Sequence, residues 1–115
     1  MDHIYCHCEQ QTCFIVKVEA DVGADPLWCQ RCGYNLDIDQ ITLSMGVKKE
    51  LMKWTQQYGE WIDWKADKLV ENGVEWEEKH NIQGEILTER VNKELGAGYK
   101  VVFSPASIAS SYEKK

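Results

Sequence analysis

The sequence contains little proline and has no excess of positive charge. Only two of its 115 residues are proline, and its 13 lysines and arginines are outnumbered by 19 aspartates and glutamates, so the formal net charge is −6. This balance argues against broad attraction to nucleic acid or anionic lipid, because both require basic side chains that neutralise phosphate. The sequence also lacks the run of about 18 apolar residues that a membrane span needs, and it opens without a charged segment followed by an apolar stretch. We therefore expect a cytoplasmic protein with no membrane association.

Large apolar side chains, by contrast, are plentiful. Hydrophobic residues make up 43% of the chain, and its aromatic residues include five tryptophans. This is enough apolar surface for one compact core, and the moderate charge content places the chain outside the disordered range. Catalytic motifs are missing, since the sequence has no glycine-rich phosphate loop, no Gly-x-Ser-x-Gly elbow and no His-Glu-x-x-His helix. We therefore predict a folded protein that is not an enzyme.

Five cysteines are many for a chain of this length, and all lie in residues 1–45, where seven acidic residues outnumber two basic ones. Four of them form two close pairs, a Cys-x-Cys and a Cys-x-x-Cys that is followed by glycine. In the cytoplasm such pairs bind metal more often than they form disulfides, and four thiolates from two tight segments suit tetrahedral zinc. The spacing predicts one structural zinc site with four ligands: Cys6, Cys8, Cys29 and Cys32.

Residues Tyr5 to Leu36, which contain both cysteine pairs, resemble a zinc ribbon, a small β module in which two cysteine knuckles share one metal ion. The resemblance implies that residues 29–32 form the second knuckle and residues 6–8 the first. Only one residue separates the cysteines of the first pair, instead of the usual two, so His3 and Cys13 stay open as alternative ligands. Iron stays open as an alternative to zinc, because four thiolates can hold either metal.

The whole chain is also similar to small uncharacterised proteins of low-GC Gram-positive bacteria and their phages. These proteins share a ribbon-like start, a Trp-rich helix and an ending like Tyr99 to Ser104. The similarity implies a bacterial or phage protein and no particular activity.

Two amphipathic helices are predicted in the middle of the chain. Ser44 is a suitable N-cap for the first, and apolar residues then recur at steps of three and four: Val47, Leu51, Trp54, Tyr58, Trp61 and Ile62. The pair Asn72-Gly73 predicts a turn. The second helix follows this turn and is expected to end at Gly96 or Gly98. Its apolar stripe consists of Trp76, His80, Gly84, Leu87, Val91 and Leu95. We expect the two helices to form a hairpin with a tight turn and with both stripes in the core.

Short strands are predicted before and after this hairpin, because residues 13–19 and 99–103 are rich in β-branched and aromatic side chains. The predicted fold class is α+β: a zinc-ribbon-like β module, a two-helix hairpin and a C-terminal strand that pairs with the sheet of the module. We divide the chain into the β module at residues 1–45, the hairpin with the final strand at residues 46–104, which forms one compact unit with the module, and a flexible tail at residues 105–115.

Trp64, Ile82 and Ile86 fall outside the main stripes of the two helices. An apolar patch outside the core often marks a partner surface, so these residues are the candidate surface unless the last strand or the zinc module covers them. The predicted function is a non-enzymatic, zinc-stabilised protein-interaction module. Its acidic charge favours a basic protein partner, and a regulator or inhibitor of a nucleic-acid-handling protein fits this description.

Two other functions stay open. Trp28 to Cys32 resembles the Trp-Cys-x-x-Cys of thioredoxin-type oxidoreductases, which would make the chain a thiol-disulfide oxidoreductase that uses Cys29 and Cys32, although no βαβ pattern surrounds the motif. Zinc ribbons often bind nucleic acid, but zinc on four thiolates has a formal charge of about −2 and would repel phosphate. Bound zinc with unreactive thiols favours the interaction module, whereas metal-free protein with a reducible disulfide favours the oxidoreductase.

Overall fold

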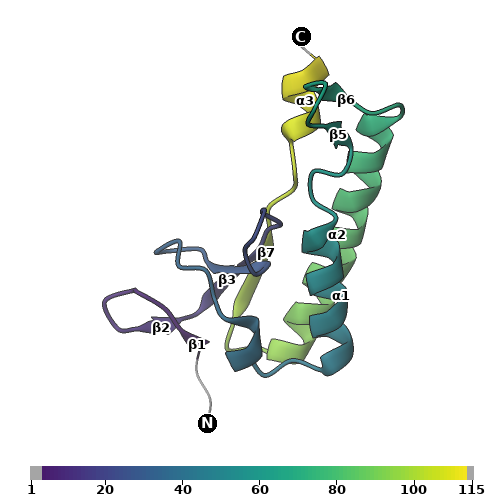
Figure 1. The fold of residues 1–115 in the computed structure, drawn as a ribbon. Coiled ribbons are helices and arrows are strands. Elements are labelled where there is room, and N and C mark those ends of the chain that lie inside the picture. The colour runs from purple at the N-terminus through teal and green to yellow at the C-terminus, as the bar shows by residue number, and fades with distance from the viewer. Residues whose placement is uncertain (1–3, 114–115) are drawn as a thin grey trace.

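The computed structural model describes residues 4–113 and confirms the α+β class, in an elongated molecule of 48 × 28 × 19 Å. Its elements in chain order are β1 (Ile4–Tyr5), β2 (Thr12–Cys13), β3 (Ile15–Val18), β4 (Leu27–Cys29), the 3-10 helix η1 (Ile38–Gln40), α1 (Met45–Gln56), β5 (Ile62–Asp63), β6 (Lys68–Leu69), α2 (Gly73–Leu95), β7 (Lys100–Phe103) and α3 (Ile108–Glu113). The two long helices lie side by side, and the first strands extend away from them (Figure 1). Within the described residues, no helix combines the length and apolar character needed to cross a membrane.

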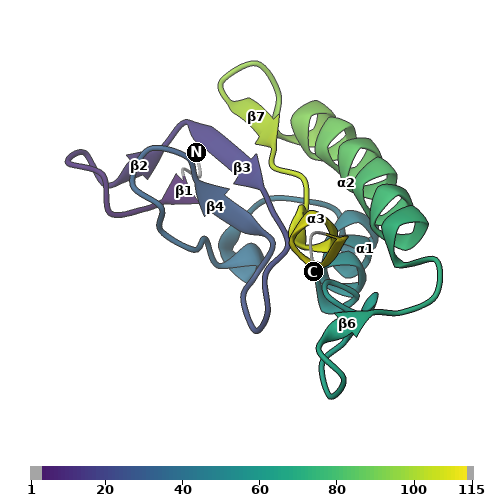
Figure 2. The ribbon, with the colours of Figure 1, turned by 90° about the horizontal axis from the view of Figure 1, so that it is seen from above.

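A three-stranded sheet connects the beginning of the chain to its end. β3 is the central strand, which pairs antiparallel with β4 and parallel with β7, and Val16 lies opposite Val101 in the parallel register. The side chains of β3 alternate, so that Val16 and Val18 are fully buried. The predicted pairing of the last strand with the N-terminal sheet is confirmed. The β1–β2 hairpin lies on the side of this sheet that is far from α2 (Figure 2).

α2 contacts both α1 and β7, and a glycine permits the close approach. Gly84 is buried, and a Cβ atom built there would lie 2.4 Å from the ring of Phe103 and 2.7 Å from the ring of Trp54. The indole N–H of Trp54 donates to the carbonyl of His80 at 2.8 Å, and the two rings stack with centroids 4.7 Å apart. Trp76, the first residue of the predicted second stripe, is exposed. Four other residues of this stripe are buried, namely His80, Gly84, Leu87 and Val91.

The first long helix ends earlier than predicted. Ser44 caps it as expected, because its Oγ accepts a hydrogen bond from the N–H of Val47 at 3.3 Å. However, α1 stops at Gln56, and the chain then turns through Gly59 at a φ of +88°, a conformation that favours glycine. The β5–β6 hairpin follows before α2 begins. The predicted tight turn between two helices is therefore wrong, because residues 57–72 form turns and a β hairpin.

A second, smaller core explains why the helix ends there. Trp61 and Ile62 leave the helical stripe and are buried together with Ala109 of α3. Figure 1 shows α3 next to β5 and β6 at one end of the molecule. The side chains that continued the helical period thus pack in a separate cluster that the C-terminal helix completes.

The end of the chain is more ordered than the predicted flexible tail over residues 105–115. Residues 108–113 form α3, and the side chain of Asn81 exchanges two hydrogen bonds with the backbone of Ala106, at 2.8 and 3.0 Å. The expectation of a tail is therefore corrected for this part, because a buried alanine and hydrogen bonds to α2 hold it. Residues 114 and 115 lie outside the described residues.

Candidate metal centre

The structure brings four of the five cysteines together. The sulfur atoms of four residues lie within 4.8 Å of one another: Cys6, Cys8, Cys29 and Cys32. The first pair lies in the loop of the β1–β2 hairpin, and the second begins at the last residue of β4 and continues into the turn after it. His3, an alternative ligand, lies outside the described residues. The four cysteines that the spacing selected are therefore placed where one ion could join them.

The second pair forms a tight turn. The N–H of Gly33 donates to the carbonyl of Cys29 at 2.8 Å, and Gly33 has a φ of +77°. The N–H of Cys29 donates to the carbonyl of Tyr34 at 2.9 Å, which closes the turn, and the N–H of Gln30 donates to the carbonyl of Ile15 at 2.9 Å. The turn is thus fixed to the central strand β3.

The first pair also lies in a turn. The N–H of Cys8 donates to the sulfur of Cys6 at 3.4 Å, and the N–H of Gln11 donates to the carbonyl of Cys8 at 2.7 Å. Gln11 has a φ of +57°, which returns the chain into β2. A backbone donor that points at a sulfur atom stabilises the thiolate, which is the form that binds metal.

Backbone donors have their clearest effect on Cys29. Burial by itself raises the pKa of this thiol, but hydrogen bonds from the backbone N–H groups of Cys32 and Arg31, together with those from the thiols of Cys13 and Cys32, outweigh the burial and lower the pKa to about 6. In contrast, a hydrogen bond with the thiol of Cys6, followed by burial, raises the pKa of Cys8 to about 12. One thiolate is thus stabilised by the backbone, while a second needs a cation before it loses its proton.

The donor set fits one tetrahedral ion. With Zn–S bonds of about 2.3 Å, the sulfur atoms of a tetrahedral site are about 3.8 Å apart. The sulfur atoms of Cys8 and Cys29 are 3.6 Å apart, close to that spacing. Cys6 and Cys29 are buried and Cys32 is exposed, so the cluster lies at the edge of the core. Four thiolates would fill a tetrahedral shell and leave no position for a reacting water molecule.

Cys13 lies beside this cluster rather than in it. It is fully buried on β2, and its thiol donates to the carbonyl of Ile15 at 3.3 Å. Burial and then a hydrogen bond with Cys29 raise its pKa, so it stays a neutral thiol. All five cysteines lie within the described residues and are free.

A protein-family model matches the part of the chain that contains the sheet and the second cysteine pair. The family model described as Serratia CdiI immunity protein-like matches residues 15–106, which is most of the chain. The chain belongs to this family. No curated protein matches it. Membership in the CdiI-like family indicates a protein-interaction role as an inhibitor, and immunity proteins of this kind are typically not enzymes.

The limits of the CdiI-like match divide the cysteine cluster. The match begins at the first residue of β3 and ends three residues after β7, so it contains Cys29 and Cys32 but neither Cys6 nor Cys8. Half of the candidate metal centre therefore comes from a segment that precedes the matched region. The match does not concern the zinc-ribbon resemblance or the expected Gram-positive or phage origin, which stay predictions.

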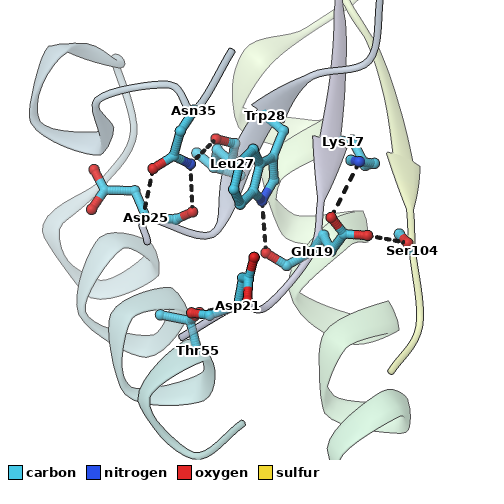
Figure 3. Close-up of polar contacts among 9 residues, drawn as sticks. All are labelled: Lys17, Glu19, Asp21, Asp25, Leu27, Trp28, Asn35, Thr55 and Ser104. Carbon is cyan, nitrogen blue, oxygen red and sulfur yellow. Dashed lines mark hydrogen bonds and ion pairs between the residues drawn. The ribbon is translucent and has the colours of Figure 1, made fainter. Parts of the chain in front are cut away.

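Sequence analysis missed a polar network that holds the second cysteine pair on the CdiI-like fold. The side chain of Asn35 accepts from the N–H of Asp25 at 3.1 Å and donates to the carbonyls of Asp25 and Leu27 at 2.8 and 3.1 Å (Figure 3). Asn35 follows the Cys29–Cys32 turn, so these bonds fix the outgoing chain against β4. The only sequence signal for this contact was the position of Asn35 shortly after the turn glycine Gly33, because asparagine side chains often bond to nearby backbone groups.

Separate polar contacts connect β3 and the loop after it to β7 and α1. Glu19 pairs with Lys17 at 3.2 Å and accepts a hydrogen bond from the hydroxyl of Ser104 at 2.7 Å (Figure 3). The hydroxyl of Thr55 donates to the carbonyl of Asp21 at 3.3 Å. Because the bonds of Glu19 to Ser104 and of Thr55 to Asp21 join segments far apart in the sequence, no local pattern predicts them.

The three residues of the candidate partner surface lie on two elements. Trp64 is 61% exposed and belongs to the β5–β6 hairpin rather than to a helix, where its indole N–H donates to the carbonyl of Gly59 at 3.1 Å. Its ring meets that of Tyr112 edge to face. Ile82 and Ile86 are 59% and 48% exposed on α2. Neither the last strand nor the N-terminal module covers the two isoleucines, and their role as a partner surface stays a prediction.

Proposed function

We propose that the chain neutralises a protein toxin by binding to it, as an immunity protein. The observation that carries this proposal is the family match over residues 15–106, which contains the whole three-stranded sheet and both long helices. Inhibition by occupying a toxin surface requires only a stable, complementary surface.

The four-cysteine centre has a structural role in this proposal, with zinc as the metal. The segment from β1 to β2 has only three buried residues, Ile4, Cys6 and Cys13, and so it has little apolar surface to hold it in place. A metal ion that joins Cys6 and Cys8 to Cys29 and Cys32 would fasten this segment to the family fold, because binding free energy adds to folding free energy.

The partner is proposed to be basic and to act on nucleic acid. The chain has a formal charge of −6, and zinc held by four thiolates would add further negative charge to its N-terminal part. A toxin that handles nucleic acid needs a basic surface to hold phosphate, and an acidic protein is the natural complement of that surface.

The test begins with capture of the partner by the tagged chain from its own cell, followed by expression of that partner alone and together with the chain. We expect the chain to restore growth and to inhibit the purified toxin in proportion to its amount, with complete inhibition at one chain per toxin. Complete inhibition by a small fraction of one equivalent would indicate an enzyme that modifies the toxin and would contradict the proposal.

Thiol-disulfide exchange is the second candidate, because the lowered pKa of Cys29 and the exposure of Cys32 also suit a redox pair. Metal analysis separates the two functions. One zinc ion per chain with thiols that resist alkylation supports the structural centre, whereas metal-free protein that reduces disulfides supports the oxidoreductase.

A further inference from the structure

A groove with an apolar floor and a basic rim runs along the outer face of α1. Its volume is about 320 Å³, and η1 forms one wall with Ile38 and Asp39. Six residues of α1 form the rest: Met45, Lys48, Lys49, Met52, Lys53 and Gln56. They recur at helical steps of three and four, so they share the face of α1 opposite its buried residues. Met45 is 67% exposed.

The charge of this groove is opposite to that of the whole chain. Three lysines and one aspartate give the groove a net charge of +2, although the formal charge of the protein is −6. The groove therefore favours an occupant that carries apolar side chains with acidic neighbours. Methionine suits such a floor, because its flexible, polarisable side chain adapts to different shapes.

The exposed face of α2 has the complementary pattern, which we call the α2 ridge. Ile82 and Ile86 form its apolar part, with exposed fractions of 59% and 48%. Glu78, Glu85 and Glu89 are exposed along one flank of these isoleucines. When Glu75, Lys79, Arg90 and Lys93 of the same face are included, the ridge has a net charge of −1.

We propose that the α1 groove binds the α2 ridge of a second copy of this chain. The isoleucines of the ridge would contact Met45 and Met52, and the glutamates would meet the lysines of the groove. Spacing supports this pairing, since the groove residues of α1 and the part of the ridge from Glu78 to Glu89 each span twelve positions of a helix. An amphipathic helix that lies in a hydrophobic groove is a common mode of recognition, in which pairs of charges on the rim set the register.

Groove and ridge are different patches of one surface. A twofold axis that pairs both patches at once would give a closed, isologous dimer, whereas a head-to-tail arrangement would be heterologous and would give a ring or an open row of copies. This association is independent of the proposed function, because it needs no toxin. Failure of either proposal therefore leaves the other intact.

The first measurement uses the purified full-length chain and sedimentation velocity. We expect the average mass to rise with concentration up to about 0.5 mM, and the association to weaken between about 0.05 M and 0.5 M salt, because the rim pairs are exposed to screening. A single species with the mass of one chain at the highest concentration would overturn the proposal.

Charge reversal then identifies the surfaces. The groove variant Lys48→Glu/Lys49→Glu/Lys53→Glu and the ridge variant Glu78→Lys/Glu85→Lys/Glu89→Lys should each associate with themselves at least about tenfold more weakly than the wild type. An equal mixture of the two variants should associate again, because each then meets an opposite charge. Absence of this rescue would overturn the proposal.

Two further variants distinguish loss of the proposed contact from effects of net charge and from loss of folding. Lys65→Glu/Lys68→Glu/Lys100→Glu makes the same change in net charge as the groove variant but outside both surfaces, and it should keep the wild-type association. Ile86→Asp should abolish the association and leave the unfolding midpoint unchanged, because Ile86 is 48% exposed in the single chain. Equal loss in the control variant, or association that survives Ile86→Asp, would overturn the proposal.

Discussion

The indole N–H of Trp61 donates a 3.0 Å hydrogen bond to the carboxylate of Glu77, which is only 9% exposed. The backbone N–H of Ala109 donates to the same oxygen at 2.9 Å. A single buried acid on α2 therefore joins the segment before β5 to the C-terminal helix α3, and the small second core depends on it.

Replacement of Glu77 should loosen this core. Glu77→Ala leaves the N–H groups of Trp61 and Ala109 without their acceptor, and we expect the free energy of unfolding to fall by about 2 kcal/mol. Glu77→Gln, which keeps an acceptor oxygen, should lose less. Denaturant unfolding measures both, and the exposed neighbour Glu78→Ala is the control, with an expected change within about 0.5 kcal/mol. Equal stability of Glu77→Ala and the wild type would show that the shared acceptor is unimportant.

Gly84→Ala should destabilise the protein although alanine is the better helix former. The new Cβ atom would lie 2.4 Å from the ring of Phe103, so the rings on both sides must move. Overpacking of this kind costs about 1–3 kcal/mol, which exceeds the gain of about 1 kcal/mol from helix propensity. Gly46→Ala in α1 is the matched control, because a Cβ atom there meets nothing within 4 Å, and it should be neutral or stabilising. The prediction fails if the two variants change the midpoint of thermal unfolding in the same direction.

Stability should decrease in mildly acidic solution through His80. Burial lowers the pKa of His80 below its ordinary value of 6.5, and this effect outweighs the hydrogen bond to Trp54 and the nearby carboxylates of Glu77 and Glu60. The unfolded chain then binds a proton at a higher pH than the folded chain, so the stabilisation is complete above pH 6.5 and declines as the pH falls toward the folded pKa. The slope is at most about 1.4 kcal/mol per pH unit.

The His80→Phe variant isolates this effect. It keeps a ring next to Trp54 but cannot take up a proton. Its free energy of unfolding should therefore vary less between pH 5 and pH 7 than that of the wild type, and the two slopes should differ by at most about 1.4 kcal/mol per pH unit. Identical pH profiles of the two proteins would exclude His80 as the source of the dependence.

Removal of the metal should loosen the N-terminal part first. A strong chelator, or Cys29→Ser, is expected to remove one zinc ion per chain and to increase amide exchange before Met45, while the amides of buried α2 residues such as Leu87 stay protected. Cys13→Ala is the control and should keep the metal, because Cys13 lies outside the four-sulfur cluster. Unchanged amide exchange in chelator would rule out a structural metal.

Much of the fold follows from local signals in the sequence. Ser44, Asn72 and Gly96 mark helix ends because each has the conformation or the hydrogen bond that its residue type favours, with φ values of +63° and +82° at the last two. The four cysteines are brought together as their spacing indicated, since two tight turns are enough to aim the sulfur atoms at one point.

The end of α1 shows where local signals are insufficient. Tyr58, Trp61 and Ile62 continue the helical period, and so the sequence favours a longer helix. Their burial depends instead on Ala109, almost fifty residues later, and this partner lies in a segment whose composition indicated a flexible tail. Likewise, the bonds of Glu19 to Ser104 and of Thr55 to Asp21 join distant segments, and no periodicity reports them.

The parallel direction of β3 and β7 separates the two segments that flank the family match. The matched family region starts with β3 and ends shortly after β7, and because the strands run in the same direction, its two boundaries lie at opposite ends of the sheet. The cysteine-bearing extension therefore leaves from one end and α3 from the other (Figure 1). The two flanking segments therefore occupy separate space, and each is anchored at its own end of the molecule, the extension at the second cysteine pair and α3 at the core of Trp61 and Ile62.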